Sequence, residues 1–242
     1  MSSLGQLSAG IAHELNNPLA GILGYAQMAK QKLSKDVISK EDKGKLSHYL
    51  EIIEKEAQRT KSITEGLLEF SRKAPEEKKP LDIREVIENT VNMMEYHINN
   101  AAVKVYQDYS QDLPLVLGNA NQLQQVFVNL VGNAIDAMDK YKKEIHIKAS
   151  KFVDERFRPP QEFLEIIVED TGRGIPPEAV NKIFEPFYTT KLGKGTGLGL
   201  AISYAIIRGH KGVITVESKE GQGTRFRIVI PAYREVRRDG RE

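Results

Sequence analysis

The chain has 242 residues, of which 40% are hydrophobic and 28% charged, and its formal net charge is +2 at pH 7. This composition is that of a folded protein long enough for two domains, and so small a net charge gives no electrostatic reason to expect nucleic acid as a partner. The absence of cysteine excludes disulfides and thiolate chemistry, and no apolar run reaches the ~18–20 residues that span a bilayer, so a soluble chain without a signal peptide is predicted.

The first predicted element is a long amphipathic helix that contains Pro18, where we expect a kink about one turn after His13. A second helix is predicted after Ser39, which forms a capping-box sequence with Asp42. Two such helices make a hairpin that cannot bury both faces alone, which favours a dimeric four-helix bundle over a monomeric hairpin packed on the rest of the chain. The apolar residues of the first helix recur in steps of three and four: Leu4, Leu7, Ile11, Leu15, Leu19, Ile22, Ala26, Ala29 and Leu33.

Residues 75–80 hold two prolines separated by charged residues and are predicted to be a linker. Beyond the linker the pattern changes to mixed structure, which begins with a helix capped by Asp82 and Glu85. Helices on one face of a mixed sheet are expected, which is an α/β sandwich. Strands are predicted near 103–106, 145–152, 163–169, 213–218 and 225–230, and helices from about 121 and near 178–184 and 198–208, before a charged tail at 235–242.

His13 lies about 200° around the first helix from Ile11 and is therefore predicted to face solvent, with Asn17 four residues on along the same face. An exposed imidazole beside the Glu14 carboxylate is a workable nucleophile, because Glu14 can hold the ring tautomer and accept the proton. A surface histidine on a helix is the ordinary alternative for so short a motif. A zinc-protease site is excluded, because Asn17 stands where the second histidine would be needed.

Asn129 and Asn133 share one face of the predicted helix that begins near residue 121. Carboxamide oxygens suit Mg²⁺, a hard ion that takes few protein ligands beside phosphate oxygens. Capping or surface asparagines are the alternative interpretation, although asparagine is a mediocre helix former and two within a helix mildly favour function.

Asp170 ends a predicted strand and is followed by Gly172 and Gly174. A buried carboxylate at this position could accept a hydrogen bond from the exocyclic amine of adenine, while the glycines let the backbone approach the ring. Taken alone, this Asp-x-Gly-x-Gly pattern is usually only a turn.

A second glycine-rich segment leads into the helix predicted from Leu198. It is neither a Walker P-loop nor a dinucleotide fingerprint, because its glycine spacing fits neither and no strand precedes it. Its amide groups and the positive end of the following helix suit phosphate, and Lys191 and Lys194 could add charge. The four histidines other than His13 have no partner pattern and are interpreted as structural or surface residues: His48, His97, His146 and His210.

In this order the segments resemble the H, N, G1 and G2 boxes of bacterial sensor histidine kinases, and the resemblance covers nearly the whole chain. The run 13–19 is similar to the H box of the nitrogen-regulation and dicarboxylate sensors, 184–187 resembles the F box and 221–224 the last glycine box. The resemblance implies a dimerisation and phosphoacceptor domain over 1–74, the linker over 75–80, a Bergerat-type ATP-binding domain over 81–234 and a charged tail over 235–242.

The resemblance also implies the chemistry: ATP phosphorylates His13, with Glu14 as general base and Asn17 orienting water for dephosphorylation of the partner. Asp170 would read adenine, and Asn133 with Asn129 would hold Mg²⁺. The implied partners are a second copy of the chain and the receiver domain of a response regulator, in the cytoplasm. The remaining residues implied to bind ATP are Gly172, Gly174, Lys191, Lys194, Gly195, Thr196, Gly197, Leu198, Gly199 and Thr224.

Two alternatives stay open at this point. A clamp ATPase or chaperone with the same nucleotide fold would need a catalytic carboxylate on the asparagine-bearing helix, where Gln125 stands one turn before Asn129. A non-catalytic scaffold would be expected to lose the adenine and Mg²⁺ residues, and these are present. Family members normally carry an upstream sensor, so with only twelve residues before His13 we expect a truncated core.

Overall fold

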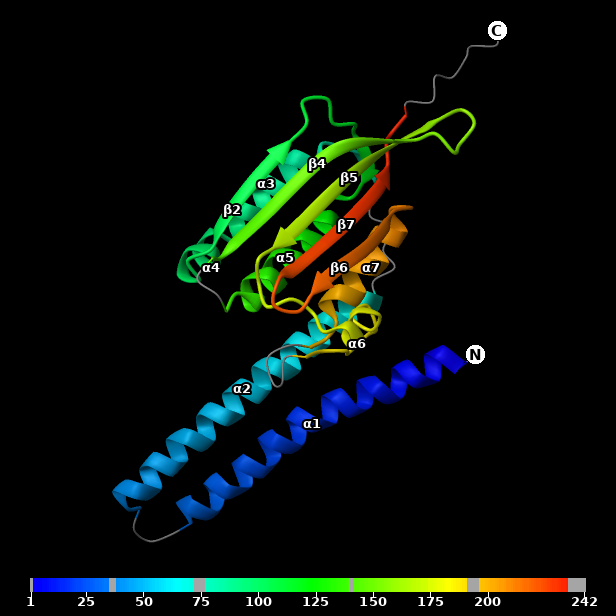
Figure 1. Cartoon of the computed structure of the whole chain (residues 1–242). Coiled ribbons are helices and arrows are strands. Elements are labelled where there is room, and N and C mark those ends of the chain that lie inside the picture. Colours follow the sequence, from blue (N-terminus) through cyan, green and yellow to red (C-terminus); the bar gives the residue numbers. More distant parts are fainter. Residues whose placement is uncertain (1, 35–37, 72–76, 140–141, 191–195, 235–242) are drawn as a thin grey trace. The chain divides into compact units, whose positions relative to one another are not determined.

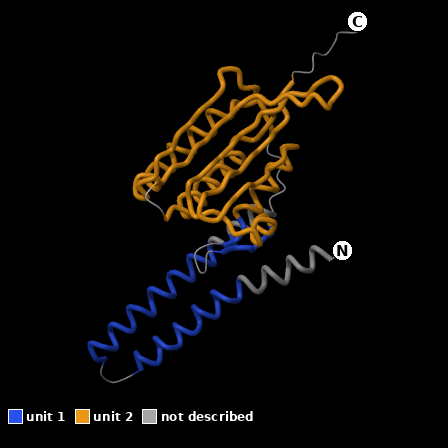
Figure 2. Tube along the Cα trace, in the orientation of Figure 1, with its two compact units in different colours: residues 1–73, 185–198 blue, residues 74–184, 199–242 orange. Residues whose placement is uncertain are grey.

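The structure, a computed structural model, describes residues 2–34, 38–71, 77–139, 142–190 and 196–234, without the side chains of 2–14, 62 and 65–71. The chain divides into two compact units (Figure 2), one made of residues 1–73 with 185–198 and the other of 74–184 with 199–242. The domain boundaries expected from the sequence stay a prediction.

The first unit is built on a hairpin of two long helices, α1 (Ser2–Leu33) and α2 (Lys40–Ser71). The amide of Asp42 donates to the Ser39 hydroxyl oxygen at 3.0 Å, so Ser39 caps α2 as the sequence predicted. Lys32 near the end of α1 donates to the Asp42 carboxylate at 2.6 Å and ties the two helices together beside this cap. α1 continues through Pro18, and the kink predicted there stays a prediction. Neither these helices nor any other in the described part of the chain has the length and apolarity to cross a lipid bilayer.

The second unit is an α/β sandwich, which confirms the predicted fold class. Its five-stranded sheet has the order β2-β4-β5-β7-β6, in which β2 runs parallel to β4 and the other neighbours are antiparallel. Figure 1 shows α3, α5 and α7 lying together against one face of this sheet. The strands are β2 (Lys104–Tyr109), β4 (Glu144–Asp154), β5 (Gln161–Asp170), β6 (Val213–Lys219) and β7 (Gly223–Pro231), and the helices are α3 (Ile83–Met93), α5 (Ala120–Ala137) and α7 (Gly199–Gly209).

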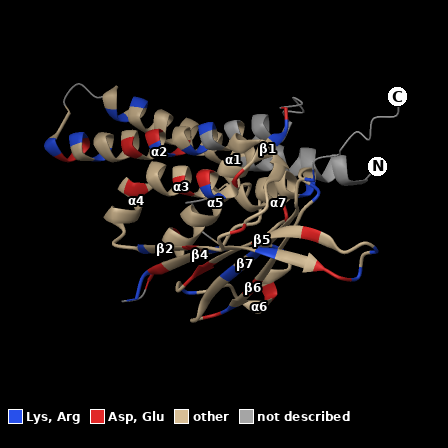
Figure 3. Cartoon of the chain, turned by 90° about the horizontal axis from the view of Figure 1, so that it is seen from above, with Lys and Arg blue, Asp and Glu red and all other residues tan. Residues whose placement is uncertain are grey.

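The core of this unit lies between the sheet and the three helices. Alternate residues of β5 and β7 are buried against the helices, and the residues between them face away from the helices. On that open face charges are paired across strands, as Arg225 with Glu169 at 3.0 Å and Arg227 with Glu165 at 2.6 Å, and both signs are interspersed (Figure 3). The largest fully buried side chains of the helices and strands of this core are Ile83, Ile87, Leu123, Phe127, Leu130, Ile145, Ile147, Leu164, Ile166, Ile207 and Ile228.

Three features of this unit differ from the sequence prediction. The linker predicted over 75–80 ends in a short strand, β1 (Lys79–Leu81), which pairs antiparallel with β3 (Val116–Gly118). Proline is tolerated there because this two-stranded sheet consists only of edges. The helix predicted near 178–184 is a single turn, α6 (Pro177–Val180), and α4 (Glu95–Asn100) follows α3 although the sequence pattern had not indicated it.

Candidate functional site

Asp170 is the last residue of β5, and its side chain is only 7% exposed. The amide of Gly172 donates to its Oδ1 at 2.8 Å, and the backbone of Thr224 on the neighbouring β7 also hydrogen-bonds the carboxylate. Burial raises the pKa of the Asp170 carboxyl to about 6, while these two hydrogen bonds act in the opposite direction. The site therefore holds a desolvated carboxylate that is ionised at neutral pH, which suits a ligand that donates a hydrogen bond.

Glycines frame this carboxylate because three backbone segments meet too closely for side chains. A Cβ on Gly172 would lie 2.7 Å from the carbonyl oxygen of Ala137, at the end of α5. Gly174 has φ +74° and its Cβ would overlap the backbone of Lys219, whereas Gly223, with φ +112°, would overlap the carbonyl of Asp170 itself. Gly172 and Gly174 are the glycines that the sequence predicts for this site, but the strictest requirement lies at Gly223, which belongs to the segment that resembles the last glycine box and was not predicted to bind ATP.

Ser218 is a further residue that the sequence analysis missed. Its hydroxyl lies 3.0 Å from that of the buried Thr224, donates to the Gly223 carbonyl at 2.8 Å and accepts from the amide of Ile175 at 2.8 Å. It thereby ties the turn that follows Asp170 to the start of β7. Its signal in the sequence was only that of an ordinary strand residue, because the contact depends on the β6–β7 register, which pairs Ser218 with Thr224.

Asn129 and Asn133 lie half-buried on α5, one turn apart. The side-chain nitrogen Nδ2 of Asn129 donates to the Gly199 carbonyl at 3.0 Å and to the Ser203 hydroxyl at 3.3 Å. These two hydrogen bonds fasten α5 to the start of α7. A Cβ on Gly199 would lie 3.3 Å from the Asn129 side-chain oxygen, so glycine keeps this approach open. The side-chain amide oxygens of the two asparagines are the type of ligand that Mg²⁺ prefers, and phosphate oxygens can supply further ligands to the same ion.

α5 also connects these asparagines to the Asp170 turn. The amide of Arg173 donates to the carbonyl of Ala137, the last residue of α5, at 2.9 Å. Asn133 lies one helical turn before Ala137. The structure thus brings Asn129, Asn133, Gly199, Thr224 and the Asp170 turn together around one helix.

The rest of the second glycine-rich segment is described only in part. Gly197 has φ +67° and packs against Phe187, which has φ +68° and donates its amide to the Gly197 carbonyl at 3.0 Å. The amide of Leu198 lies 3.4 Å from the Thr196 hydroxyl. The predicted phosphate-binding residues Lys191, Lys194 and Gly195 lie outside the described residues.

The predicted phosphoacceptor face lies on α1. His13 and Glu14 belong to this helix, and their side chains lie outside what the structure describes. Asn17 is exposed on the same helix, and the neighbouring Pro18 is buried. These roles stay predictions.

The other histidines have structural or surface positions. His48 and His97 are exposed. His146 stacks on Tyr106 with ring centroids 4.8 Å apart. His210 is 4% exposed, its Nε2 accepts from the amide of Asn119 at 3.1 Å and its Nδ1 donates to the Ile206 carbonyl at 2.8 Å, so the ring is neutral. Burial lowers the pKa of His210.

Comparison with known families finds two matches along the chain. Residues 3–76 match the family described as "His Kinase A (phospho-acceptor) domain". Residues 118–234 match the family described as "Histidine kinase-, DNA gyrase B-, and HSP90-like ATPase".

Similar proteins include Sporulation kinase A of Bacillus subtilis, 35% identical over 96% of this chain and 35% of its own length. The sensory histidine kinase/phosphatase NtrB of Rhodobacter capsulatus is 37% identical over 91% of this chain and 60% of its own length. The chain therefore spans between about a third and three fifths of these relatives. Among solved structures, histidine kinase ThkA in complex with the response regulator protein TrrA matches with a TM-score of 0.71 and 29% identity, over 96% of this chain and 63% of that one.

Proposed function

The chain belongs to the histidine kinases, and on this premise we propose that it transfers the γ-phosphoryl group of ATP to His13 and then to an aspartate of a response regulator. The proposal depends chiefly on the buried Asp170 carboxylate of the sheet domain. The same chain contains a segment that matches a phosphoacceptor domain. ATP is the proposed phosphoryl donor, and the activity is proposed to take place in the cytoplasm.

Recognition of adenine is proposed to rest on Asp170. Its carboxylate is ionised at neutral pH and accepts hydrogen bonds, so the exocyclic amine of adenine can donate to it. A guanine ring would present a carbonyl oxygen there, and two acceptors facing each other repel. The proximity of Gly172, Gly174 and Gly223 to neighbouring backbone keeps the carboxylate at a fixed position.

Binding of the triphosphate is proposed to involve the two asparagines of α5. Asn133 and Asn129 would hold Mg²⁺, and the ion would supply neutralisation of phosphate charge. Asn129 also fastens the first turn of α7, whose amide groups suit phosphate. Gly195, Gly197 and Gly199, with Thr196, Leu198, Lys191, Lys194 and Thr224, are proposed to complete the ATP site.

The transfer step is proposed to be an in-line displacement. A ring nitrogen of His13 attacks the γ-phosphorus, the bond to the β–γ bridging oxygen breaks, and ADP leaves. Glu14 accepts the proton from the other ring nitrogen, so the phosphorylated ring is neutral. Positioning and charge neutralisation supply most of the catalysis in phosphoryl transfer, so separate acceptor and nucleotide units suit the reaction.

Two copies of the chain are proposed to form a homodimer through the exposed apolar side chains of the α1–α2 hairpin. Leu19, Leu23 and Leu33 on α1 and Leu50 on α2 are between 48% and 61% exposed, and Met28 is 46% exposed. Large apolar side chains gathered on one hairpin favour burial against a second copy. A four-helix bundle made by two hairpins would cover them.

A receiver domain is proposed as the acceptor of the phosphoryl group. The ThkA structure is a complex with a response regulator protein, and NtrB is named a kinase and phosphatase. The exposed Asn17, one turn beyond His13, is proposed to orient the water that hydrolyses the partner's phospho-aspartate.

Covalent labelling tests this function. The protein is incubated with Mg²⁺ and γ-labelled ATP, and the denatured product is treated with acid and with alkali. A label that acid removes and alkali leaves in place is expected for phosphohistidine, and α-labelled ATP should give none. ATP hydrolysis without any covalent label would contradict the proposal and favour a clamp ATPase.

A further inference from the structure

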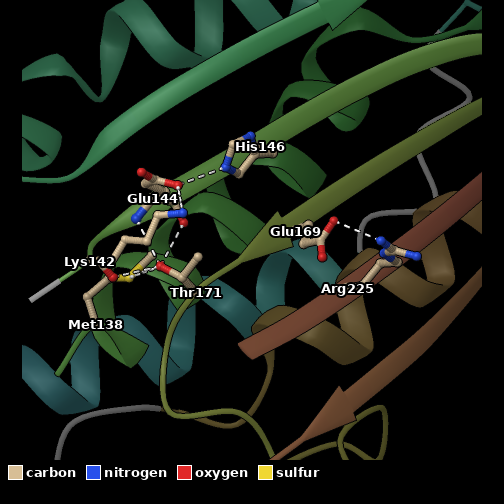
Figure 4. A network of polar contacts seen from close by, with 7 residues as sticks. All are labelled: Met138, Lys142, Glu144, His146, Glu169, Thr171 and Arg225. Atoms are coloured by element: carbon tan, nitrogen blue, oxygen red, sulfur yellow. Dashed lines mark hydrogen bonds and ion pairs between the residues drawn. The ribbon is translucent and has the colours of Figure 1, made fainter. Parts of the chain in front are cut away.

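Thr171, directly after Asp170, makes contacts that the proposed function does not use. Its hydroxyl donates to the carbonyl of Lys142 at 2.8 Å and accepts from the amide of Glu144 at 3.0 Å (Figure 4). The Thr171 amide also donates to the Glu144 carbonyl at 3.1 Å. One side chain thus pairs with two backbone groups where the chain enters β4.

The segment that Thr171 holds is the connection from α5 to β4. Met138 caps the end of α5, and its sulfur lies 4.0 Å from the Thr171 hydroxyl, so the same side chain contacts both ends of that connection (Figure 4). Lys142 and Glu144 form an ion pair at 3.0 Å beside these contacts. The described ends of this connection, Met138 on one side and Lys142 with Glu144 on the other, are therefore both held by the residue next to Asp170.

The other side of the turn has little freedom. Gly172 is buried, its Cβ position is 2.7 Å from the Ala137 carbonyl, and the amide of Arg173 donates to the same carbonyl at 2.9 Å. With Thr171 on one side and these contacts on the other, the turn that carries Asp170 is fastened to the end of the helix that carries Asn133.

We propose that Thr171 is a positioning residue for adenine recognition: its hydroxyl fixes the Asp170 carboxylate relative to the end of α5 and so sets both affinity and selectivity for ATP. This inference rests on the proposed function. Without the hydroxyl, the Lys142 carbonyl and the Glu144 amide must find water, which shifts the start of β4 and the turn paired with it. The carboxylate then meets the adenine amine at a poorer distance.

Thr171→Val tests the proposal, because valine keeps the shape and removes only the hydroxyl. We expect the dissociation constant for ATP to rise about tenfold, because the hydrogen bond between the adenine amine and the Asp170 carboxylate is weakened. Weak GTP binding should change little, so the ATP-to-GTP selectivity falls. Thr171→Ser keeps the hydroxyl and should restore both values. Thr215→Val is the matched control, because the Thr215 hydroxyl is exposed on β6 and lies 3.5 Å from the Arg227 carbonyl.

Titration with ATP and with GTP, together with thermal unfolding of the nucleotide-free protein, decides the matter. A lower melting temperature with unchanged selectivity would mean that Thr171 is only structural and would overturn the proposal, as would Thr171→Val binding ATP like the wild type. Failure of the wild type to bind ATP would instead contradict the proposed function.

Discussion

Replacing Asp170 by asparagine should stabilise the nucleotide-free protein at neutral pH while it weakens ATP binding. Asparagine has nearly the same shape, and its side-chain oxygen can still accept from the amide of Gly172, which lies 2.8 Å from Oδ1 in the wild type. The substitution removes a buried charge and one of the two acceptor oxygens that the carboxylate offers to the backbone amides of Gly172 and Thr224. Burial raises the pKa of this carboxyl from 3.8 to about 6, and at about 1.4 kcal/mol per pH unit this difference of about two units corresponds to about 3 kcal/mol.

The sign follows from the direction of the shift. A carboxyl whose pKa is higher in the folded protein than in the unfolded chain leaves stability intact below about pH 4, lowers it progressively between about pH 4 and pH 6, and gives the full loss above that range. Asp170→Asn has no such loss, so its advantage in free energy of unfolding should approach about 3 kcal/mol at pH 7 and vanish near pH 4. For a unit of this size that corresponds to a rise of about 6–12 °C in melting temperature.

Thermal unfolding followed by circular dichroism between pH 4 and pH 8, with and without ATP, measures both effects. ATP should raise the melting temperature of the wild type but much less that of the variant, because losing a charged hydrogen bond costs about 1.5–3 kcal/mol of binding. Asp154→Asn is the control: hydrogen bonds from Arg156 lower the pKa of Asp154, so this variant should not be stabilised. A less stable Asp170→Asn protein at pH 7, or unchanged ATP affinity, would refute the reasoning.

Three further predictions concern other parts of the chain. Gly174→Ala should lower both ATP affinity and melting temperature, because φ is +74° and the new Cβ overlaps the Lys219 backbone, at a cost of at least 1–3 kcal/mol; Gly44→Ala on α2, with nothing within 4 Å, should be neutral or stabilising, and equal behaviour of the two variants would contradict the geometry. Asn17→Ala should leave autophosphorylation largely unchanged while it slows dephosphorylation of the partner; a joint loss of autophosphorylation and melting temperature would instead assign Asn17 a structural role beside Pro18. His210 should contribute less stability as the pH falls below 6.5 through its lowered pKa, because only the neutral ring accepts from the Asn119 amide; His210→Gln, which keeps an acceptor and does not titrate, should therefore gain melting temperature relative to the wild type as the pH falls, whatever the other groups contribute to both proteins; a difference between the two melting profiles that does not change with pH would argue against it.

The parts of this structure that local sequence determines were predictable. Ser39 caps α2 and Asp82 caps α3, because capping depends only on residues within one turn. The alternation of buried and exposed residues in β5, followed by the Asp-x-Gly-x-Gly pattern, led to Asp170 as a buried carboxylate at a strand end, and the structure places it there.

The parts that depend on contacts between distant segments were not predictable. Ser218 joins the site only because β6 and β7 pair in one particular register, and Gly223 only because β5 and β7 do. β1 and β3 have three residues each and show no usable alternation. The fastening of Asn129 to Gly199 joins residues 70 positions apart. No periodicity in a single sequence reports such a contact.

The central claim is tested most directly by comparing the wild type with His13→Gln in two measurements made under the same conditions. One is covalent labelling by γ-labelled ATP, and the other is ATP affinity by titration. The account predicts an acid-labile, alkali-stable label on the wild type, no label on His13→Gln and nearly equal ATP affinity for both, because acceptor and nucleotide site lie in different parts of the chain. Label that persists on His13→Gln, or a wild type that binds ATP and never becomes labelled, would contradict it.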